Sequence, residues 1–299
     1  MEKVYKSQVK LLLDVLPLVA KEKCFALHGG TAINLFVRNM PRLSVDIDLT
    51  YLQIEDWDTS IGEINNALSR IKSDIEKSMN ATAVLKAEVS KLLISTKQAS
   101  IKLEVSRMGR GAYEEPEVRV LCERAQEEYN TFCEITVVPL GQLYGGKICA
   151  ALDRQHPRDI FDVKYLLANE GFNDEIKKGF LFCLLGAKRP LFEMLNPNFI
   201  DQKSALEKQF NGMTSEALSY EEYEQIKVQL VETVTNGLDK IDREFLLAFK
   251  NMTPNWEKYA YSHFPSIKWK MKHLQELMEK NPSKHKDMLN ELKKALKLS

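Results

Sequence analysis

The sequence is poor in the features that mark membrane, secreted and strongly charged proteins. No apolar run approaches the roughly 20 residues that a membrane helix needs, so we expect no membrane segment. The first ten residues contain no apolar core of a secretory signal, which predicts a cytoplasmic protein. Lys plus Arg equals Asp plus Glu at 42 each, so the net charge indicates no polyanionic partner.

Cysteine patterns typical of zinc sites or disulfide scaffolds are absent as well. The five cysteines are odd in number and scattered through apolar neighbourhoods, and no C-x-x-C pair occurs. The five histidines show no metal-ligand spacing with them. This pattern predicts reduced, mostly buried thiols in a reducing compartment.

What is present is an ordinary globular composition, 44% apolar and 28% charged, in a chain of 299 residues that is long enough for two domains. Strand and helix patterns are mixed up to about residue 138, and the pattern beyond it is almost wholly helical. The predicted strands are 24–27, 43–51, 81–88, 91–96, 99–106, 117–121 and 132–138. The predicted helices are 3–22, 31–39, 55–77, 140–154, 158–168, 174–185, 200–210, 220–236, 239–250, 264–280 and 284–297.

A Gly-Gly pair separates the first predicted strand from the helix that follows it. Gly29 and Gly30 allow the backbone to approach a phosphate, and the first N–H groups of the helix are placed to point at it. Thr31 is a candidate helix cap or an additional hydroxyl contact. The alternative for this pair is a plain tight turn.

Two carboxylates share one face of the strand 43–51. Asp46 and Asp48 lie two residues apart, so both project to the same side, opposite the apolar residues of the strand. Neighbouring carboxylates repel each other, and a hard divalent cation such as Mg²⁺ resolves that conflict by taking oxygen ligands from both. Aspartate is depleted in strands, which favours a metal site over the alternative of an exposed acidic face.

The strand 99–106 offers a further carboxylate. Its alternation places Lys102, Glu104 and Ser106 on one face. If this strand neighbours 43–51, Glu104 is a candidate third metal ligand. The alternative is a solvent-facing glutamate paired with Lys102 or with a cross-strand partner.

A second polar cluster occurs at the start of the helical half, in the run K-I-C-A-A-L-D-R-Q-H-P-R-D-I-F-D that begins at residue 147. Pro157 is predicted to open a new helix within it. The candidate site residues of the cluster are Lys147, Arg154, Arg158, Asp159 and Asp162. They form either a surface ion-pair ladder of little energetic value or a cleft wall that grips triphosphate oxygens. Together with the acidic pair, they point to phosphoryl or nucleotidyl transfer, with one carboxylate as a candidate base for an attacking hydroxyl.

The two motifs also resemble those of a known family. L-H-G-G-T-A-I-N-L followed by R-L-S-V-D-I-D-L resembles the nucleotidyltransferase-fold toxins of the AbiEii/AbiGii family, found in type IV-like toxin–antitoxin and phage-defence pairs. The later Lys, Arg and R-D-x-x-D are similar to the second motif of that family. The resemblance covers about residues 24–52 and 140–168, with the two motifs in the expected order.

The resemblance implies an α+β fold, with a mixed-sheet nucleotidyltransferase core over 1–138 and a helical domain over 139–299 that carries the second motif. It implies that Asp46 and Asp48 bind Mg²⁺ or Mn²⁺, and that Gly29, Gly30 and Ser44 line the triphosphate pocket. In the second motif, Lys147 would bind phosphate, and Asp162, with Asp159, would be catalytic or would orient Lys147 and Arg158. The expected partners are an NTP, an RNA acceptor, and a cognate antitoxin that need not form a stable complex.

Family members with known activity transfer nucleotides to the 3′ end of tRNA, so tRNA is the expected acceptor here. A protein hydroxyl or a small-molecule acceptor is an alternative. A different class of function is a nucleotide-binding sensing or interaction module with little turnover. A nuclease is disfavoured, because the motifs contain no obvious water-activating histidine.

Overall fold

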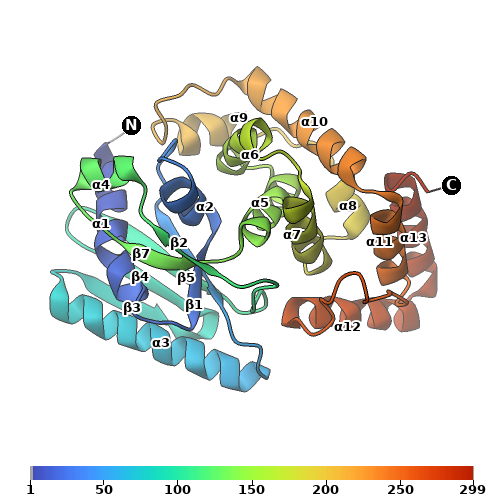
Figure 1. Ribbon diagram of the computed structural model, residues 1–299, viewed down its shortest axis with the longest axis horizontal. Helices are drawn as coiled ribbons and strands as arrows, with labels where there is room; N and C mark the ends of the chain where they lie inside the picture. Colours follow the sequence, from blue (N-terminus) through green and yellow to red (C-terminus); the bar gives the residue numbers. More distant parts are fainter. Residues whose placement is uncertain (1–2, 299) are drawn as a thin grey trace. The chain divides into compact units, whose positions relative to one another are not determined.

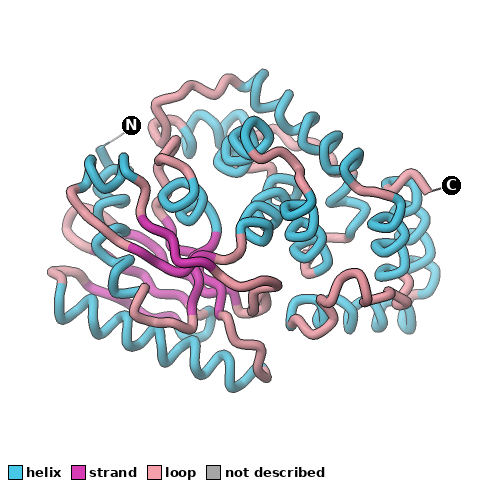
Figure 2. Tube along the Cα trace, in the orientation of Figure 1, coloured by secondary structure: helices cyan, strands magenta, loops and turns pink. Residues whose placement is uncertain are grey.

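The computed structural model describes residues 3–298 of the chain. The chain forms two compact units: Met1–Pro139 with Glu207–Ala217, and Leu140–Leu206 with Leu218–Ser299. The strands belong to the first unit, and the described part of the second unit consists of helices and their connections (Figure 2).

The first unit is built on a seven-stranded mixed sheet with the order β3-β4-β5-β2-β1-β7-β6. The strands are β1 (Phe25–His28), β2 (Asp46–Tyr51), β3 (Thr82–Lys86), β4 (Lys91–Ser95), β5 (Ser100–Ser106), β6 (Glu117–Val120) and β7 (Glu134–Val137). The central strand β2 is antiparallel to β1 and parallel to β5, and β1 is parallel to β7. The pairs β3–β4, β4–β5 and β6–β7 are antiparallel.

Helices α1 (Lys3–Val19) and α3 (Trp57–Ser78) contact each other and the strands of this sheet (Figure 1). Both carry apolar residues at helical spacing, and these residues are buried, which explains why the two helices pack on the sheet. The Asp56 carboxylate caps α3 by accepting the Thr59 N–H at 3.0 Å. The shorter helices are α2 (Gly29–Ala32), which continues into a π-helical turn (Ile33–Val37), a 3₁₀ turn (Ala87–Val89) and α4 (Glu123–Tyr129).

A segment distant in sequence completes the first unit. The Leu43 N–H donates to the Met213 carbonyl at 2.7 Å, and the Thr214 hydroxyl donates to the Pro41 carbonyl at 3.0 Å. Arg42 and Thr214 also form an isolated antiparallel bridge. These bonds fix the chain just before β2. The sequence-based domains, 1–138 and 139–299, were each unbroken and so did not include this attachment.

The second unit is helical. Its helices are α5 (Leu140–Arg154), α6 (Pro157–Asn169), α7 (Asp174–Leu185), α8 (Leu191–Leu195), α9 (Lys203–Ala205), α10 (Tyr220–Gly237), α11 (Lys240–Lys250), α12 (Pro265–Lys280) and α13 (Pro282–Ala295). The π-helical turn Leu206–Phe210 that follows α9 begins at the last residue of the stretch Leu140–Leu206, and its other residues belong to the first unit. Helices α5 and α7 cross at glycines: a Cβ on Gly145 would lie 2.2 Å from the Gly179 carbonyl carbon, and one on Gly179 would lie 1.8 Å from the Gly141 oxygen. Only glycine permits this approach.

The α+β fold class is confirmed. The predicted strands and most of the predicted helices occur, with ends shifted by a few residues, whereas the short helices α4 and α8 were not predicted. The helix predicted over 200–210 is instead the three-residue α9 followed by the π-helical turn Leu206–Phe210. The predicted helix 31–39 is instead the α2 turn followed by the π-helical turn. Within residues 3–298, no helix combines the length and apolar character required to cross a membrane.

Candidate active site

The acidic pair lies at the centre of the sheet. Asp46 and Asp48 project from one face of β2 and are partly exposed, while Ile47 and Leu49 on the other face are buried. The parallel register with β5 pairs Asp46 with Lys102 and Asp48 with Glu104. The two predicted strands are therefore neighbours, as the third-ligand hypothesis required.

Glycines bring the β1–α2 turn into contact with this pair. His28 pairs with Asp48 across β1 and β2, and Gly29 follows with φ +73°, which favours glycine. A Cβ on Gly29 would lie 2.7 Å from Asp48 Oδ2. The Asp48 carboxylate therefore packs directly on the Gly29 backbone, and any side chain at this position would displace it.

The second glycine borders a buried arginine. A Cβ on Gly30 would lie 2.8 Å from Arg42 Nη2 and 3.1 Å from Ser44 Oγ. Arg42 is 2% exposed, and its Nη1 donates to the Leu43 carbonyl at 2.9 Å. Sequence reasoning gave Arg42 no role, although it stands two residues before Ser44 in the first motif. Its position adds a positive charge beside the Gly-Gly turn.

Thr31 and Ser44 connect the turn to β2. Both are buried; the Thr31 hydroxyl donates to the Asp46 backbone carbonyl at 2.5 Å, and its oxygen lies 3.0 Å from Ser44 Oγ. In this arrangement Thr31 positions the start of β2. The contact links the Gly-Gly turn to the residue that carries the first carboxylate.

Lysines on the neighbouring strands balance the negative charge. The Glu104 carboxylate accepts ion pairs from Lys102 at 3.1 Å and from Lys91 at 3.3 Å. Burial raises the pKa of Glu104, but the two lysines outweigh burial and lower it overall. Burial lowers the pKa of Lys102, but the charges of the two aspartates and Glu104 outweigh burial and raise it. Lys102 thus faces the acidic pair, a role that its position on the Glu104 face of the strand could have indicated.

These side chains fit a metal ion that arrives with a nucleotide. Mg²⁺ commonly takes one or two protein carboxylates and completes its coordination with water and substrate phosphates. Asp46 and Asp48 supply such oxygen donors side by side. Over residues 3–298, no group of three or more His, Cys, Asp or Glu side chains is placed to hold a metal. The ion pairs of Glu104 favour the alternative given above for this residue.

The second cluster is an ion-pair network within the second unit. The Lys147 ammonium lies 2.7 Å from Asp159 Oδ1 and 2.9 Å from Asp162 Oδ2. Arg154 donates to both oxygens of Asp159, at 2.6 Å from Nε and 3.1 Å from Nη2. Lys147 on α5 and the two aspartates on α6 are buried, with Asp159 only 1% exposed. The structure therefore contradicts the surface-ladder alternative for these three residues.

The local helix geometry explains this network. Pro157 begins α6, and the His156 ring caps the helix by accepting the Arg158 N–H at 3.1 Å. The spacing of three residues then puts Asp159 and Asp162 on one face of α6. Burial raises the pKa of Asp159, but the charge of Lys147 and the hydrogen bonds of Arg154 outweigh burial and hold that pKa well below its usual range. The Arg154 side chain is 63% exposed, which leaves much of it accessible.

A mixed sheet with a glycine turn beside paired strand aspartates is the architecture of a nucleotidyltransferase. The chain is similar to MenT4, a nucleotidyltransferase toxin from Mycobacterium tuberculosis H37Rv, at 12% identity and a TM-score of 0.63, over 91% of this chain and 93% of MenT4. That likeness shows a shared fold. A search of curated protein sequences finds no match.

The sequence model of the AbiEii family, described as the nucleotidyl transferase AbiEii toxin of type IV toxin–antitoxin systems, matches residues 10–256. The chain belongs to this family. The predicted family and enzyme class, a nucleotidyltransferase toxin that uses an NTP and has a cognate antitoxin, are confirmed.

Proposed function

We propose that this protein is a cytoplasmic, metal-dependent toxin that transfers a nucleotide from an NTP to the 3′ end of tRNA. The observation that carries the proposal is the Asp46–Asp48 pair on β2, packed against the Gly29 backbone. This arrangement supports metal binding next to a backbone that a phosphate can approach. The cognate antitoxin counteracts the activity without needing a stable complex.

Each of the two clusters has a proposed role in this reaction. Asp46 and Asp48 hold Mg²⁺ or Mn²⁺, which when bound neutralises charge on the triphosphate. Gly29, Gly30 and Ser44 line the phosphate path, and Thr31 holds Ser44 and the start of β2 in place. Glu104 receives no metal role, because two lysines engage its carboxylate.

In the second cluster, Lys147 binds phosphate, and Asp159 and Asp162 orient its ammonium. The short contacts of both carboxylates with Lys147 support that orienting role. Arg154 and Arg158 contribute further phosphate contacts, and the exposure of Arg154 is compatible with such a contact. Asp162 is the candidate catalytic carboxylate of this cluster.

The test is incubation of the purified protein with total tRNA, Mg²⁺ and each labelled NTP in turn, resolved on a denaturing gel. We expect label on tRNA with a specific NTP and no label with the Asp46→Asn, Asp48→Asn double variant. The matched control removes two exposed carboxylates instead, through Asp58→Asn and Asp287→Asn, and should retain activity.

The outcomes separate the alternatives. Label on protein or on a small molecule, but not on tRNA, would reject the tRNA acceptor while retaining the transferase. Tight NTP binding without consumption, even with tRNA present, would instead support a nucleotide-sensing module. Equal labelling by the wild type and the Asp46, Asp48 double variant would refute the assigned site.

A further inference from the structure

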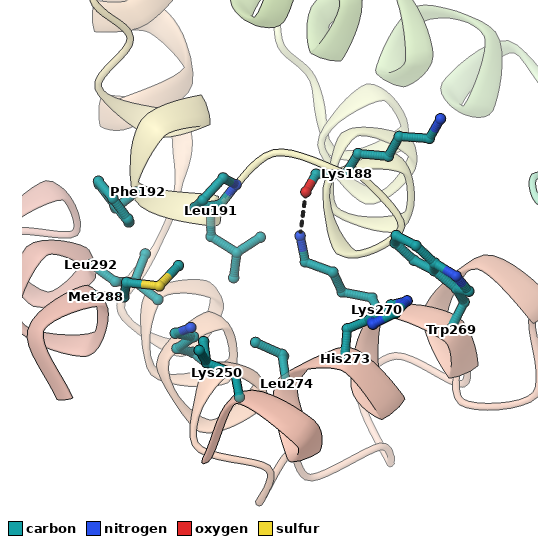
Figure 3. A pocket seen from close by; sticks show the side chains of 12 residues that line it. Lys188, Leu191, Phe192, Lys250, Trp269, Lys270, His273, Leu274, Met288 and Leu292 are labelled. Atoms are coloured by element: carbon teal, nitrogen blue, oxygen red, sulfur yellow. Dashed lines mark hydrogen bonds between the residues drawn. The ribbon is translucent and has the colours of Figure 1, made fainter. Parts of the chain in front are cut away.

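The second unit contains a cavity of about 260 Å³ (Figure 3). It lies among the loop after α7, helix α8, the end of α11, and helices α12 and α13. Apolar side chains form most of its wall: Leu191, Phe192, Leu274, Leu277, Met288 and Leu292. Its volume suits a molecule of roughly ten non-hydrogen atoms. Because α12 and α13 lie beyond residue 256, much of this wall falls outside the family match.

The charged residues that line this cavity are all basic. They are Lys188, Lys250 and Lys270, and His273 is also present, whereas no carboxylate occurs among the described lining residues. The exposed Lys188 side chain points away from the cavity in Figure 3. The Lys270 ammonium donates to three backbone carbonyls, those of residues 187, 188 and 189, at 2.6, 3.2 and 2.9 Å. All three of its protons are thereby used to hold the loop that follows α7.

Lys250 differs from both of these lysines. Its side chain is 4% exposed, and within residues 3–298 its ammonium forms no hydrogen bond or ion pair. Burial lowers the pKa of Lys250 to about 8, so most of it still carries its charge at neutral pH. The neighbouring titratable groups are Lys270, His273 and His285, whose ring lies 2.9 Å from the Lys250 backbone carbonyl. None of these three can supply an opposite charge. The carboxylate of Glu193 acts on Lys270 and lies 3.6 Å from Arg189.

A largely buried lysine whose ammonium has no partner is unfavourable, because the charge loses much of its hydration and gains no hydrogen bond in return. A bound anion would supply that partner. The apolar wall would accept the remainder of the same molecule, since burying its surface is favourable. Because Lys250 supplies one unpaired ammonium, a ligand with one negative charge would match it.

We propose that this cavity binds a small monoanionic molecule with an apolar body, whose carboxylate pairs with the Lys250 ammonium. The site is independent of the transferase residues assigned above. A small amphipathic carboxylate fits both the wall and the cation. A phosphate dianion would require more donors than Lys250 offers.

The test uses three probes with the same eight-carbon chain: octanoate, 1-octanol and octylamine. Isothermal titration calorimetry measures their binding to the full chain at pH 7. We expect octanoate to bind at one site, roughly tenfold or more tighter than 1-octanol, with octylamine weakest, because a buried charge-assisted hydrogen bond contributes that factor.

Two variants locate the effect. Lys250→Met keeps a side chain of similar shape without the charge, and should bind octanoate and 1-octanol about equally. Lys268→Met removes the charge of an exposed lysine on the same helix as Lys270, and should behave as the wild type. Circular dichroism and thermal melting confirm that both variants fold.

Other outcomes overturn the proposal. If octanoate binds no more tightly than 1-octanol, the cavity recognises only the apolar chain and not the carboxylate. A preference for octanoate that persists in Lys250→Met would place the anion elsewhere. If no probe binds, the cavity is a packing gap beside an unpaired lysine.

Discussion

Asp159→Asn isolates the energetic contribution of the buried ion-pair network in the second unit. The amide keeps the shape of the side chain but removes the charge that Lys147 and Arg154 share. Removing one partner of a buried pair typically costs about 3–5 kcal/mol, because the other charge stays buried and uncompensated. Here Asp162 remains 2.9 Å from Lys147, and Arg154 is largely exposed, so we expect the lower end, about 3 kcal/mol.

Thermal melting of the variant measures this loss. For a unit of this size, about 3 kcal/mol corresponds to a decrease of roughly 6–12 °C in Tm. The matched control is Asp153→Asn, which removes an exposed carboxylate of α5 that pairs with Arg189. An exposed pair contributes at most about 1 kcal/mol, so this variant should melt close to the wild type. Equal Tm values for the two variants would refute a stabilising role for the buried network.

The pH dependence gives a second, independent test. The folded pKa of Asp159 lies below its unfolded value, so its ionised form stabilises the fold fully above the unfolded pKa, about 3.9. This contribution decreases as the pH falls from there through the folded pKa. The stability difference between wild type and Asp159→Asn should therefore be constant from pH 5 to 7 and shrink below about pH 4. The urea midpoints of both proteins at pH 7, 5, 4 and 3 measure this stability difference. A difference that grows as the pH falls would contradict the lowered pKa of Asp159.

Three further predictions follow from single positions. Gly29→Ala should abolish tRNA labelling while the protein stays folded, because its Cβ would meet Asp48 Oδ2 at 2.7 Å; labelling at the wild-type rate would contradict this. Gly179→Ala should unfold the second unit or lower its Tm steeply, whereas Gly62→Ala, with open space around its Cβ, should be neutral or stabilising by up to about 1 kcal/mol; melting both variants checks this. For Lys250, the folded pKa of about 8 lies below the usual value, so its charge destabilises the fold below pH 8 and this penalty fades as the pH rises to about 10.5. Lys250→Met should accordingly be more stable than the wild type at pH 7, with a smaller advantage at pH 10, as urea midpoints at both values would show.

Most of the secondary structure could be predicted because it depends on local periodicity. The alternation through β2 placed Asp46 and Asp48 on one face and the apolar residues on the other, as the structure has them. Pro157 marked the start of α6 for a similar reason, since it lacks the N–H that an interior helical position needs. The shortest helices were not predicted, because a few residues carry too little pattern to stand out from a loop.

The partners of the charged residues depended on contacts between distant segments. Glu104 was open to two interpretations until the register set Lys91 on β4 opposite it. Arg42 carried no signal of burial, because an arginine in a sequence is exposed by default. Its burial follows from the missing side chain at Gly30 and from the segment that returns to bridge it at Thr214.

The sequence by itself determined the family, the two motifs and the order of the elements, because each of these depends on residue types that lie close together in the chain. Only the tertiary structure decided which charges meet: Lys147 with its two buried aspartates, Lys102 with the acidic pair, and Lys250 with no partner at all among residues 3–298. The physical reason is that ion pairing and desolvation depend on distance in space and on burial. Packing determines both the distances and the burial, and it often brings together segments that are far apart in the chain.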